Sequence, residues 1–272
     1  MSAEKRTRPL WLLWSIATIV LWGLWGLVSK VASNGVDVYV NQLLYTVGLA
    51  PLMVFVGWKV YKHSPREDAK ARRKGVFWAF LTGILGGLGN LAFFQALVKG
   101  GEASIVSPVT ALFPMVTVLL AVIFLRERLG RTQWVGLALV FWGITGVTQK
   151  LSTNSISSER SFLWFCWAMV ALSAAVLVVA HPHWGLGALV VWSSIAGGAL
   201  NGLGAWTSFR ALESGGKASI VISLISLYPL LTVGLAVVLL GEPLTWMQMA
   251  GAVVAIAAAI LLSLEASPKA EA

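Results

Sequence analysis

The sequence predicts an all-α fold, namely a polytopic bundle of transmembrane helices. Of the 272 residues, 58% are hydrophobic and only 11% are charged, and the mean hydropathy is +0.81. A soluble domain carries about a quarter charged residues. The apolar residues also gather in long runs, and a helical run of about twenty residues crosses roughly 30 Å of hydrocarbon. The composition therefore excludes a soluble protein.

Nine apolar runs can be placed along the chain. The loop of residues 62–74 and the N-terminal tail of residues 1–9 are both rich in Lys and Arg. Basic loops stay on the cytoplasmic side of a membrane, so the N-terminus is expected there. Because the basic residues cluster in such loops, the net charge of +9 does not indicate nucleic-acid binding. The predicted spans cover residues 10–32, 38–61, 75–98, 104–125, 132–148, 162–180, 188–212, 219–240 and 245–264.

A long internal repeat organises the chain. Residues 100–129 read GGEASIVSPVTALFPMVTVLLAVIFLRERL, and residues 215–244 read GGKASIVISLISLYPLLTVGLAVVLLGEPL. The two segments align without a gap at an offset of 115 residues. A repeat of this length decides the architecture. Two copies of a membrane unit are typical of secondary transporters, in which the solute site lies between the halves.

The repeated Gly-Gly, Ala-Ser, Pro and Leu-x-Glu-x-Leu pattern resembles the EamA-type repeat of the drug/metabolite transporter superfamily. Residues 22–30 (WGLWGLVSK) resemble the start of such a repeat. The resemblance covers most of the chain. It implies a multi-pass carrier of a small organic metabolite in the plasma (inner) membrane, with export as the direction it suggests. It also implies ten spans and leaves the substrate open.

The second half departs from that pattern, because it has room for one helix where the first half has two. Ten spans would place the two repeats in opposite orientations. Nine spans would leave the last three helices parallel to the third, fourth and fifth. The expected division is an N-terminal tail (1–9), a first repeat of five helices (10–149), a linker (150–161), a shortened second repeat (162–264) and a polar C-terminal tail (265–272).

Two prolines, Pro114 and Pro229, occupy the same position in the two copies. A proline inside a helix removes one hydrogen bond and clashes with the carbonyl four residues before it. We expect these kinks to border the solute cavity and to act as hinges. The alternative is a kink that is merely tolerated in packing.

Two glutamates, Glu127 and Glu242, are equivalent in the same way and lie in short loops. A carboxylate in such a loop can accept backbone N–H bonds and is stabilised electrostatically at a helix N-terminus. We therefore expect a structural role for both, and the alternative is a direct part in proton coupling.

The solute site is expected at mid-membrane between the repeats, lined by aromatic and polar side chains from deep in the spans. Polar groups that face lipid are costly, so they should face the interior. Arg210 matches Gln95 in the repeat, so it could hold an anionic group of the solute, or it could snorkel to the interface. The aromatic candidates could instead face lipid or pack between helices. The candidates are Trp22, Trp25, Asn90, Phe94, Gln95, Trp206, Arg210 and Tyr228.

An enzyme is not expected, because the sequence has no Ser/His/Asp set, acidic cluster or phosphate-binding glycine loop. His181 and His183 flank a proline without further ligands nearby, so no metal or other cofactor is expected. The first interpretation is a secondary-active or facilitative transporter of a neutral or zwitterionic metabolite, working by alternating access. The alternative is a non-transporting membrane scaffold that retains the fold. The expected partners are a small-molecule solute and the lipid bilayer, and the oligomeric state is left open.

Overall fold

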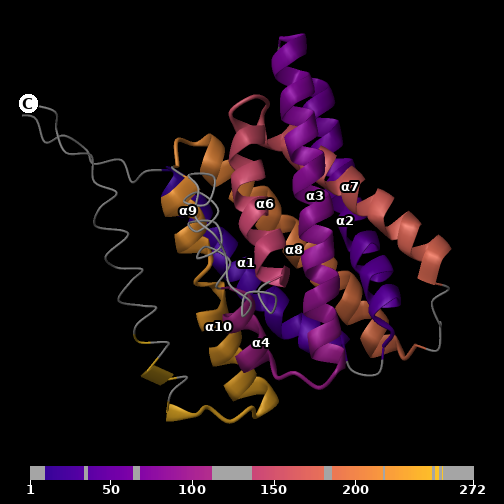
Figure 1. Ribbon diagram of the computed structural model, residues 1–272, viewed down its shortest axis with the longest axis vertical. Helices are drawn as coiled ribbons and strands as arrows, with labels where there is room; N and C mark the ends of the chain where they lie inside the picture. Colours follow the sequence, from indigo (N-terminus) through magenta and orange to yellow (C-terminus); the bar gives the residue numbers. More distant parts are fainter. Residues whose placement is uncertain are drawn as a thin grey trace, which may run out of the picture.

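The computed structural model describes residues 10–33, 36–63, 68–111, 137–180, 186–216, 218–246, 249–250 and 253. Across these residues the secondary structure is helical, without a strand, and the helices form one bundle (Figure 1). The helices are α1 (Leu10–Ala32), α2 (Val38–His63), α3 (Ala69–Val98), α4 (Ala103–Thr110), α6 (Leu137–Thr153), α7 (Ser158–Ala180), α8 (Ala188–Glu213), α9 (Ala218–Ile225), α10 (Tyr228–Leu235) and the π-helical turn η2 (Ala236–Leu240).

Six helical stretches of the described residues are long and apolar enough to cross a membrane. The chain is therefore a multi-pass membrane protein. The predicted spans at 104–125, 132–148 and 245–264 lie partly outside the described residues, as do Pro114 and Glu127. The six stretches are Leu10–Ala32, Val38–His63, Ala69–Val98, Ser158–Ala180, Ala188–Glu213 and Ile220–Leu240.

Helix α3 begins six residues earlier than the sequence predicted, at Ala69 rather than at residue 75. The reason is local, because the Asp68 carboxylate accepts the backbone N–H groups of Lys70 and Ala71 at 3.1 and 3.3 Å. This N-cap satisfies donors that a helix start otherwise leaves open. Part of the basic loop predicted at 62–74 is thus helical.

Side-chain contacts give the directions of the helices. Helices α1 and α8 are antiparallel, since Thr18 bonds to Thr207 at 2.8 Å, whereas Trp22, one turn further along α1, bonds to Asn201 at 3.1 Å. Helices α1 and α3 are parallel, because Trp25 of α1 stacks on Phe93 of α3 and, further along both helices, Lys30 reaches the carbonyl of Gly101 just after α3. Helix α8 is consequently antiparallel to α3.

Helix α6 is also antiparallel to α3. Thr82 of α3 donates to Thr148 at 2.7 Å, and Ser152 donates to the carbonyl of Gly75 at 3.0 Å. A later residue of α6 thus contacts an earlier residue of α3. The nine-span prediction had α8 parallel to α3, and the structure differs, because α8 is antiparallel to α3. These hydroxyl contacts join helices that are distant in the sequence, so the order of apolar runs alone does not reveal them.

Repeat-equivalent glycines show which helices correspond. Gly83 and Gly87 of α3 pack against α7, where a Cβ at Gly83 would collide with the carbonyl of Phe165. Gly198 and Gly202, each 115 residues later, pack against α2, where a Cβ at Gly198 would collide with the carbonyl of Tyr45. Small residues allow such close approach between transmembrane helices. Helix α7 therefore occupies the same position relative to α3 that α2 occupies relative to α8.

Helices α1 and α6 correspond in the same manner. Lys30 at the end of α1 donates to the carbonyl of Gly101 at 2.7 Å. Lys150 near the end of α6 donates to the carbonyl of the equivalent Gly216 at 3.0 Å. The sequence WGLWGLVSK at 22–30 has a counterpart 120 residues later, WGITGVTQK at 142–150. We infer that the second repeat begins with α6, upstream of the linker predicted at 150–161.

The span predicted at 219–240 is broken in the middle. Helix α9 ends at Ile225, and α10 begins at Tyr228 with Pro229 in its first turn. Ile225 is the residue whose carbonyl the proline ring would meet in a continuous helix, and a proline in a first turn removes an N–H that has no helical partner. The break is where the sequence predicted a kink, and the hinge role of Pro229 stays a prediction.

Candidate functional site

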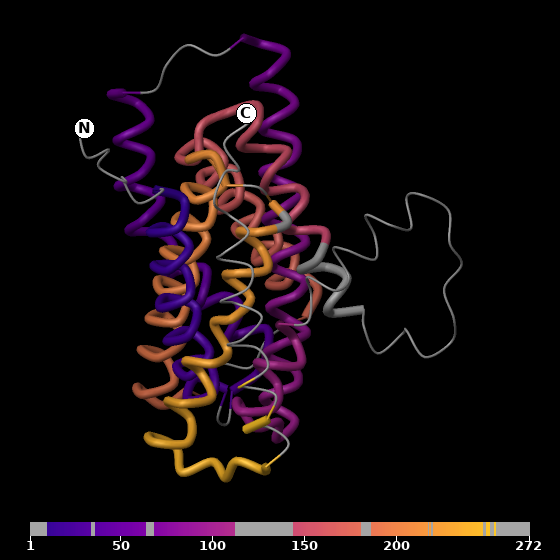
Figure 2. Tube along the Cα trace, turned by 90° about the vertical axis from the view of Figure 1, so that its left-hand side faces the viewer, coloured from indigo at the N-terminus to yellow at the C-terminus, as the bar shows by residue number. Residues whose placement is uncertain are grey.

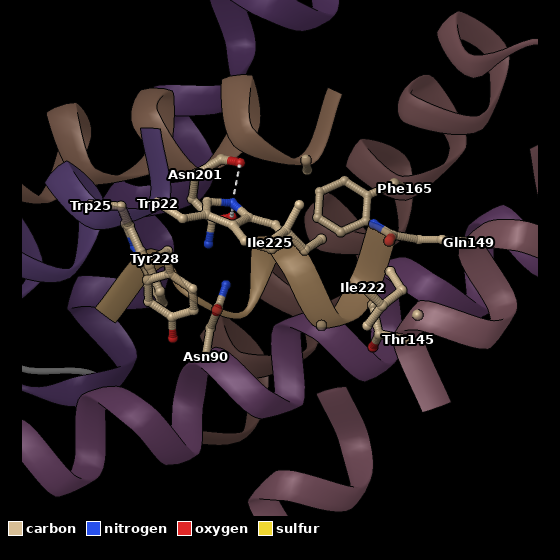
Figure 3. Close-up of a pocket in the computed structure, with 13 residues that line it drawn as sticks. Trp22, Trp25, Asn90, Thr145, Gln149, Phe165, Asn201, Ile222, Ile225 and Tyr228 are labelled. Atoms are coloured by element: carbon tan, nitrogen blue, oxygen red, sulfur yellow. Dashed lines mark hydrogen bonds between the residues drawn. The ribbon is translucent and has the colours of Figure 1, made fainter. Parts of the chain in front are cut away.

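A small cavity lies inside the bundle between the helices of both repeats. Its volume is about 60 Å³, and its walls come from α1, α3, α6, α7, α8, α9 and α10. Figure 3 shows these side chains around one shared space. The lining residues are Trp22, Trp25, Gly86, Asn90, Thr145, Gly146, Gln149, Phe165, Asn201, Ala205, Ile222, Ile225 and Tyr228.

Aromatic rings form one wall of the cavity. Trp25 stacks on Phe93 with ring centroids 4.8 Å apart, and its ring lies 6.2 Å from that of Tyr228. Trp22 meets Tyr228 edge to face at 5.9 Å. These spacings are those at which aromatic rings attract one another beyond simple burial. The break between α9 and α10 places Tyr228 in this wall, which fixes the rings in relation to each other.

Carboxamide groups supply the polar part of the lining. Asn201 accepts the Trp22 indole N–H at 3.1 Å, and Gln149 accepts the Ser208 hydroxyl at 3.1 Å. Asn90 is buried on α3, and Figure 3 shows its amide across the space from Asn201. An amide offers both a donor and an acceptor. The cavity can therefore bind groups of either hydrogen-bonding type.

The lining residues that the structure describes include no charged side chain. A solute with a net charge would lose its hydration there and gain no counter-charge in return. Aromatic faces and amides instead suit an uncharged group, or an aromatic ring with polar substituents.

Four of the predicted site residues meet at this cavity, namely Trp22, Trp25, Asn90 and Tyr228. Phe94 is buried but packs against Tyr45, with ring centroids 5.8 Å apart, and is not among the lining residues. Gln95 was expected to face the interior, whereas its side chain is exposed on α3, one position beyond the buried face of that helix.

Trp206 and Arg210 lie in a group of charged residues at one end of the bundle. We call this the basic end, and define it as the end where α2 finishes and α3 begins (upper end in Figure 2). The Lys59 ammonium lies 5.6 Å from the centre of the Trp206 ring. Arg210 pairs with Glu159 at 3.0 Å and with Glu213 at 3.4 Å. Neither Trp206 nor Arg210 is a lining residue of the cavity.

Glu159 of α7 is the centre of this charged group. Its carboxylate accepts from Lys59 of α2 at 2.7 Å as well as from Arg210 of α8. Its side chain is only 11% exposed, so water screens these pairs less than it screens pairs on an open surface. Ser158 adds a bond of 2.6 Å to the Glu213 carboxylate. The ion pairs thus join α2, α7 and α8 at the basic end.

The opposite end of the bundle, where α1 finishes and α4 begins, is held by Glu242. Its two carboxylate oxygens accept the backbone N–H groups of Ala103 at 3.1 Å and Ser104 at 2.8 Å. A carboxylate at a helix N-terminus is stabilised by the helix dipole. The helix whose start these bonds cap is α4, which belongs to the other repeat. Glu127 lies outside the described residues.

Asn201, a polar residue that we expected to face the bundle interior, lines the cavity. Other lining residues were missing from the predicted site, in particular Gln149 and Phe165. They belong to α6 and α7, which pack against helices of the first half. The second copy of the Trp-Gly-x-x-Gly-x-x-x-Lys pattern, at 142–150, is the signal that could have found Gln149. It makes α6 the equivalent of α1, and α1 already supplied Trp22 and Trp25.

Comparison with known proteins gives one family. The model of the EamA-like transporter family matches residues 9–147 and 137–264. The second match begins at the first residue of α6, and the two overlap within that helix. The start of the second match agrees with the contacts, which make α6 the equivalent of α1. The end of the first match shows that the sequence of α6 also continues the first repeat.

Individual relatives match over short segments. An uncharacterized protein of Methanocaldococcus jannaschii is 38% identical over 26% of this chain and 52% of its own length. A UDP-galactose transporter homolog of Cryptococcus neoformans is 38% identical over 29% of this chain and 19% of its own length. A solved crystal structure covers 94% of this chain and 97% of its own, with 19% identity and a TM-score of 0.63, which shows the same fold.

Proposed function

Because the chain belongs to the EamA-like transporter family, we propose that it carries a neutral or zwitterionic organic metabolite with an aromatic or apolar portion. The central cavity is the proposed solute site. The observation that carries the proposal is its lining, in which aromatic rings and carboxamides from both repeats surround one buried space. Export across the plasma membrane is the direction we propose.

The lining also argues against an anionic solute. The relative named as a UDP-galactose transporter homolog would bind a diphosphate, which needs cationic partners. Among the predicted site residues, Arg210 is the one cation that could bind such a diphosphate, and its partners are Glu159 and Glu213. Its guanidinium is thus engaged in ion pairs, which supports a solute without a strongly anionic group.

The size of the cavity supports a carrier in an occluded state, in which the site is closed at both ends. At about 60 Å³ it is far smaller than the roughly 300 Å³ or more of a typical small-molecule pocket. Solute entry therefore requires the helices to separate at one end. The Glu242 contact would release when the opposite end opens, and the ion pairs of Glu159 would release when the basic end opens. The break at Ile225–Tyr228 is the proposed flexing point, and Pro229 its hinge.

Solute flux into proteoliposomes tests the proposal. Tryptophan (a zwitterion), uridine (neutral), UDP-galactose (anionic) and tetramethylammonium (cationic) would be offered to the purified protein. We expect flux of tryptophan or uridine and little of the other two. The absence of flux for all four, with the protein folded, would favour the non-transporting alternative.

Two variants make the test specific to the cavity. Asn90→Leu removes a lining amide, and Gln95→Leu removes an exposed amide five residues further along the same helix. A hydrogen bond to an uncharged group contributes about 1–1.5 kcal/mol, so Asn90→Leu should reduce flux at low solute concentration by roughly tenfold. Gln95→Leu should leave it nearly unchanged. Equal effects would place the solute site elsewhere.

A further inference from the structure

A second hollow, separate from the central cavity, lies on the outside of the basic end. It is a groove of about 570 Å³ between α2, α3 and α7. Its most notable residues are three arginines, Arg72 and Arg73 from α3 and Arg160 from α7. None of these three side chains lines the central cavity, so the proposed transport function leaves them without a role.

The arginines suit a phosphate group. Guanidinium groups present fixed donors that bind phosphate oxygens in pairs, and they keep their charge when partly buried. Arg72 and Arg73 are exposed, and Arg160 is half-buried. The lining residues of the groove include no carboxylate among those described.

The other walls of the groove are apolar. Val60 of α2 and Leu163 of α7 face it together with Trp164, whose side chain is 39% exposed. The groove adjoins the outer surface of the bundle, where Trp167 and Phe77 are also exposed. A multi-pass membrane protein presents such a surface to lipid. An occupant that matches both features has an anionic headgroup and apolar chains.

The equivalent place at the opposite end has no such charges. At the offset of 115 residues, Arg72 and Arg73 correspond to Gly187 and Ala188. At the offset of 120 residues, Arg160 corresponds to Val40, which is fully buried. The repeat therefore reproduces the helices but not the arginines. A site of this kind would serve one leaflet of the membrane only.

We propose that this groove binds the phosphate headgroup of an anionic phospholipid in the leaflet at the basic end. Basic pockets between transmembrane helices are a recognised place for anionic headgroups. The lipid chains lie along Val60 and Leu163. Because the arginines come from both α3 and α7, the bound lipid holds these two helices together. It does so beside the ion pairs of the basic end, since Arg160 directly follows Glu159 in α7. This site does not depend on the identity of the solute.

Native mass spectrometry of the purified protein tests the site. Phosphatidylglycerol and phosphatidylcholine with the same chains would be titrated in detergent, and the thermal stability followed in parallel. We expect one phosphatidylglycerol to be retained in preference to phosphatidylcholine. The variant R72Q/R73Q/R160Q should weaken this binding by at least about tenfold, since each basic residue near a membrane surface contributes about 1 kcal/mol.

A matched control removes the same charge from the same end. The variant K62Q/K70Q/K74Q changes three exposed lysines that do not line the groove, and it should keep the preference for phosphatidylglycerol. Equal loss in both triple variants would overturn the site in favour of general attraction to a basic surface. Stabilisation by inorganic phosphate equal to that by the lipid would overturn the lipid assignment. If Arg160→Gln prevents folding, R72Q/R73Q gives the same test, because both side chains are exposed.

Discussion

The two ends of the bundle are built from equivalent helices but are closed by different chemistry. At the basic end Glu159 joins α2 and α8 through ion pairs with Lys59 and Arg210. At the opposite end the positions equivalent to Glu159 and Arg210 are Tyr39 and Gln95, which form no ion pair. There Glu242 caps α4 instead, through two backbone N–H groups.

The difference separates what the repeat preserves from what it varies. Both repeats keep the glycines where helices touch, such as Gly83 and Gly198, and the lysines over the carbonyls of Gly101 and Gly216. The ion-paired side chains of the basic end, in contrast, have no charged counterparts at the opposite end. A carrier with two identical ends would open both equally, so we infer that these charges set the relative free energies of its two open states.

The largest expected effect concerns the preserved framework. Gly83→Ala and Gly198→Ala each place a methyl group against a backbone carbonyl of the neighbouring helix. Because a backbone cannot move aside as a side chain can, each should destabilise the fold by up to about 3 kcal/mol. Thermal unfolding in detergent measures this. Gly234→Ala is the control, since a Cβ there would meet open space, and a parent-like melting temperature for Gly198→Ala would refute the close packing.

The next effect separates the two ends. Glu159→Gln leaves Lys59 and Arg210 without their shared counter-charge, in a place where Glu159 is 11% exposed. We expect a loss of about 1–2 kcal/mol, between the values for exposed and for buried pairs. Tyr39→Phe, at the equivalent position of the opposite end, should change the melting temperature little. Equal losses for the two variants would mean that the ion pairs do not distinguish the ends.

A smaller effect is expected at the opposite end. Glu242→Ala removes both acceptors from the N-terminus of α4, which should destabilise the protein by about 1 kcal/mol, as for the loss of an N-cap. Hydrogen exchange at Ala103 and Ser104 provides the local measurement. Exchange as slow in the variant as in the parent would show that Glu242 does not hold this helix.

The smallest effect compares the two lysines. Lys150 donates to two carbonyls, those of Leu212 and Gly216, whereas Lys30 has the carbonyl of Gly101. Lys150→Met should therefore cost more than Lys30→Met, each within about 1 kcal/mol, as for a cation near a helix C-terminus. The melting temperatures of the two variants give the order, and the reverse order would show that the second carbonyl contact of Lys150 does not add stability.

The sequence predicted the membrane class, the repeat and the bounds of α1 because these follow from composition and local pattern. It also predicted where Pro229 breaks a helix, since a proline acts on its own helix. The pairing of Arg210 with Glu213, three residues on, follows from local helix spacing. Its pairing with Glu159 could not be predicted, because Glu159 lies 51 residues away in sequence and meets Arg210 only through packing. The directions of α6 and α8 depend on similar long-range contacts, such as that between Thr18 and Thr207.

Accessibility of the cavity from each end tests the central claim most directly. Ala205 lines the cavity, and Ala205→Cys would be made in a Cys166→Ser background, which removes the one native cysteine. An impermeant thiol reagent would then be added to sealed vesicles of either orientation. Glu159→Gln should speed labelling from the basic end alone, by roughly tenfold for a shift of about 1.4 kcal/mol between states. Glu242→Ala should speed labelling from the opposite end alone. Labelling that stays unchanged, or that rises from both ends together, would contradict a cavity gated separately at its two ends.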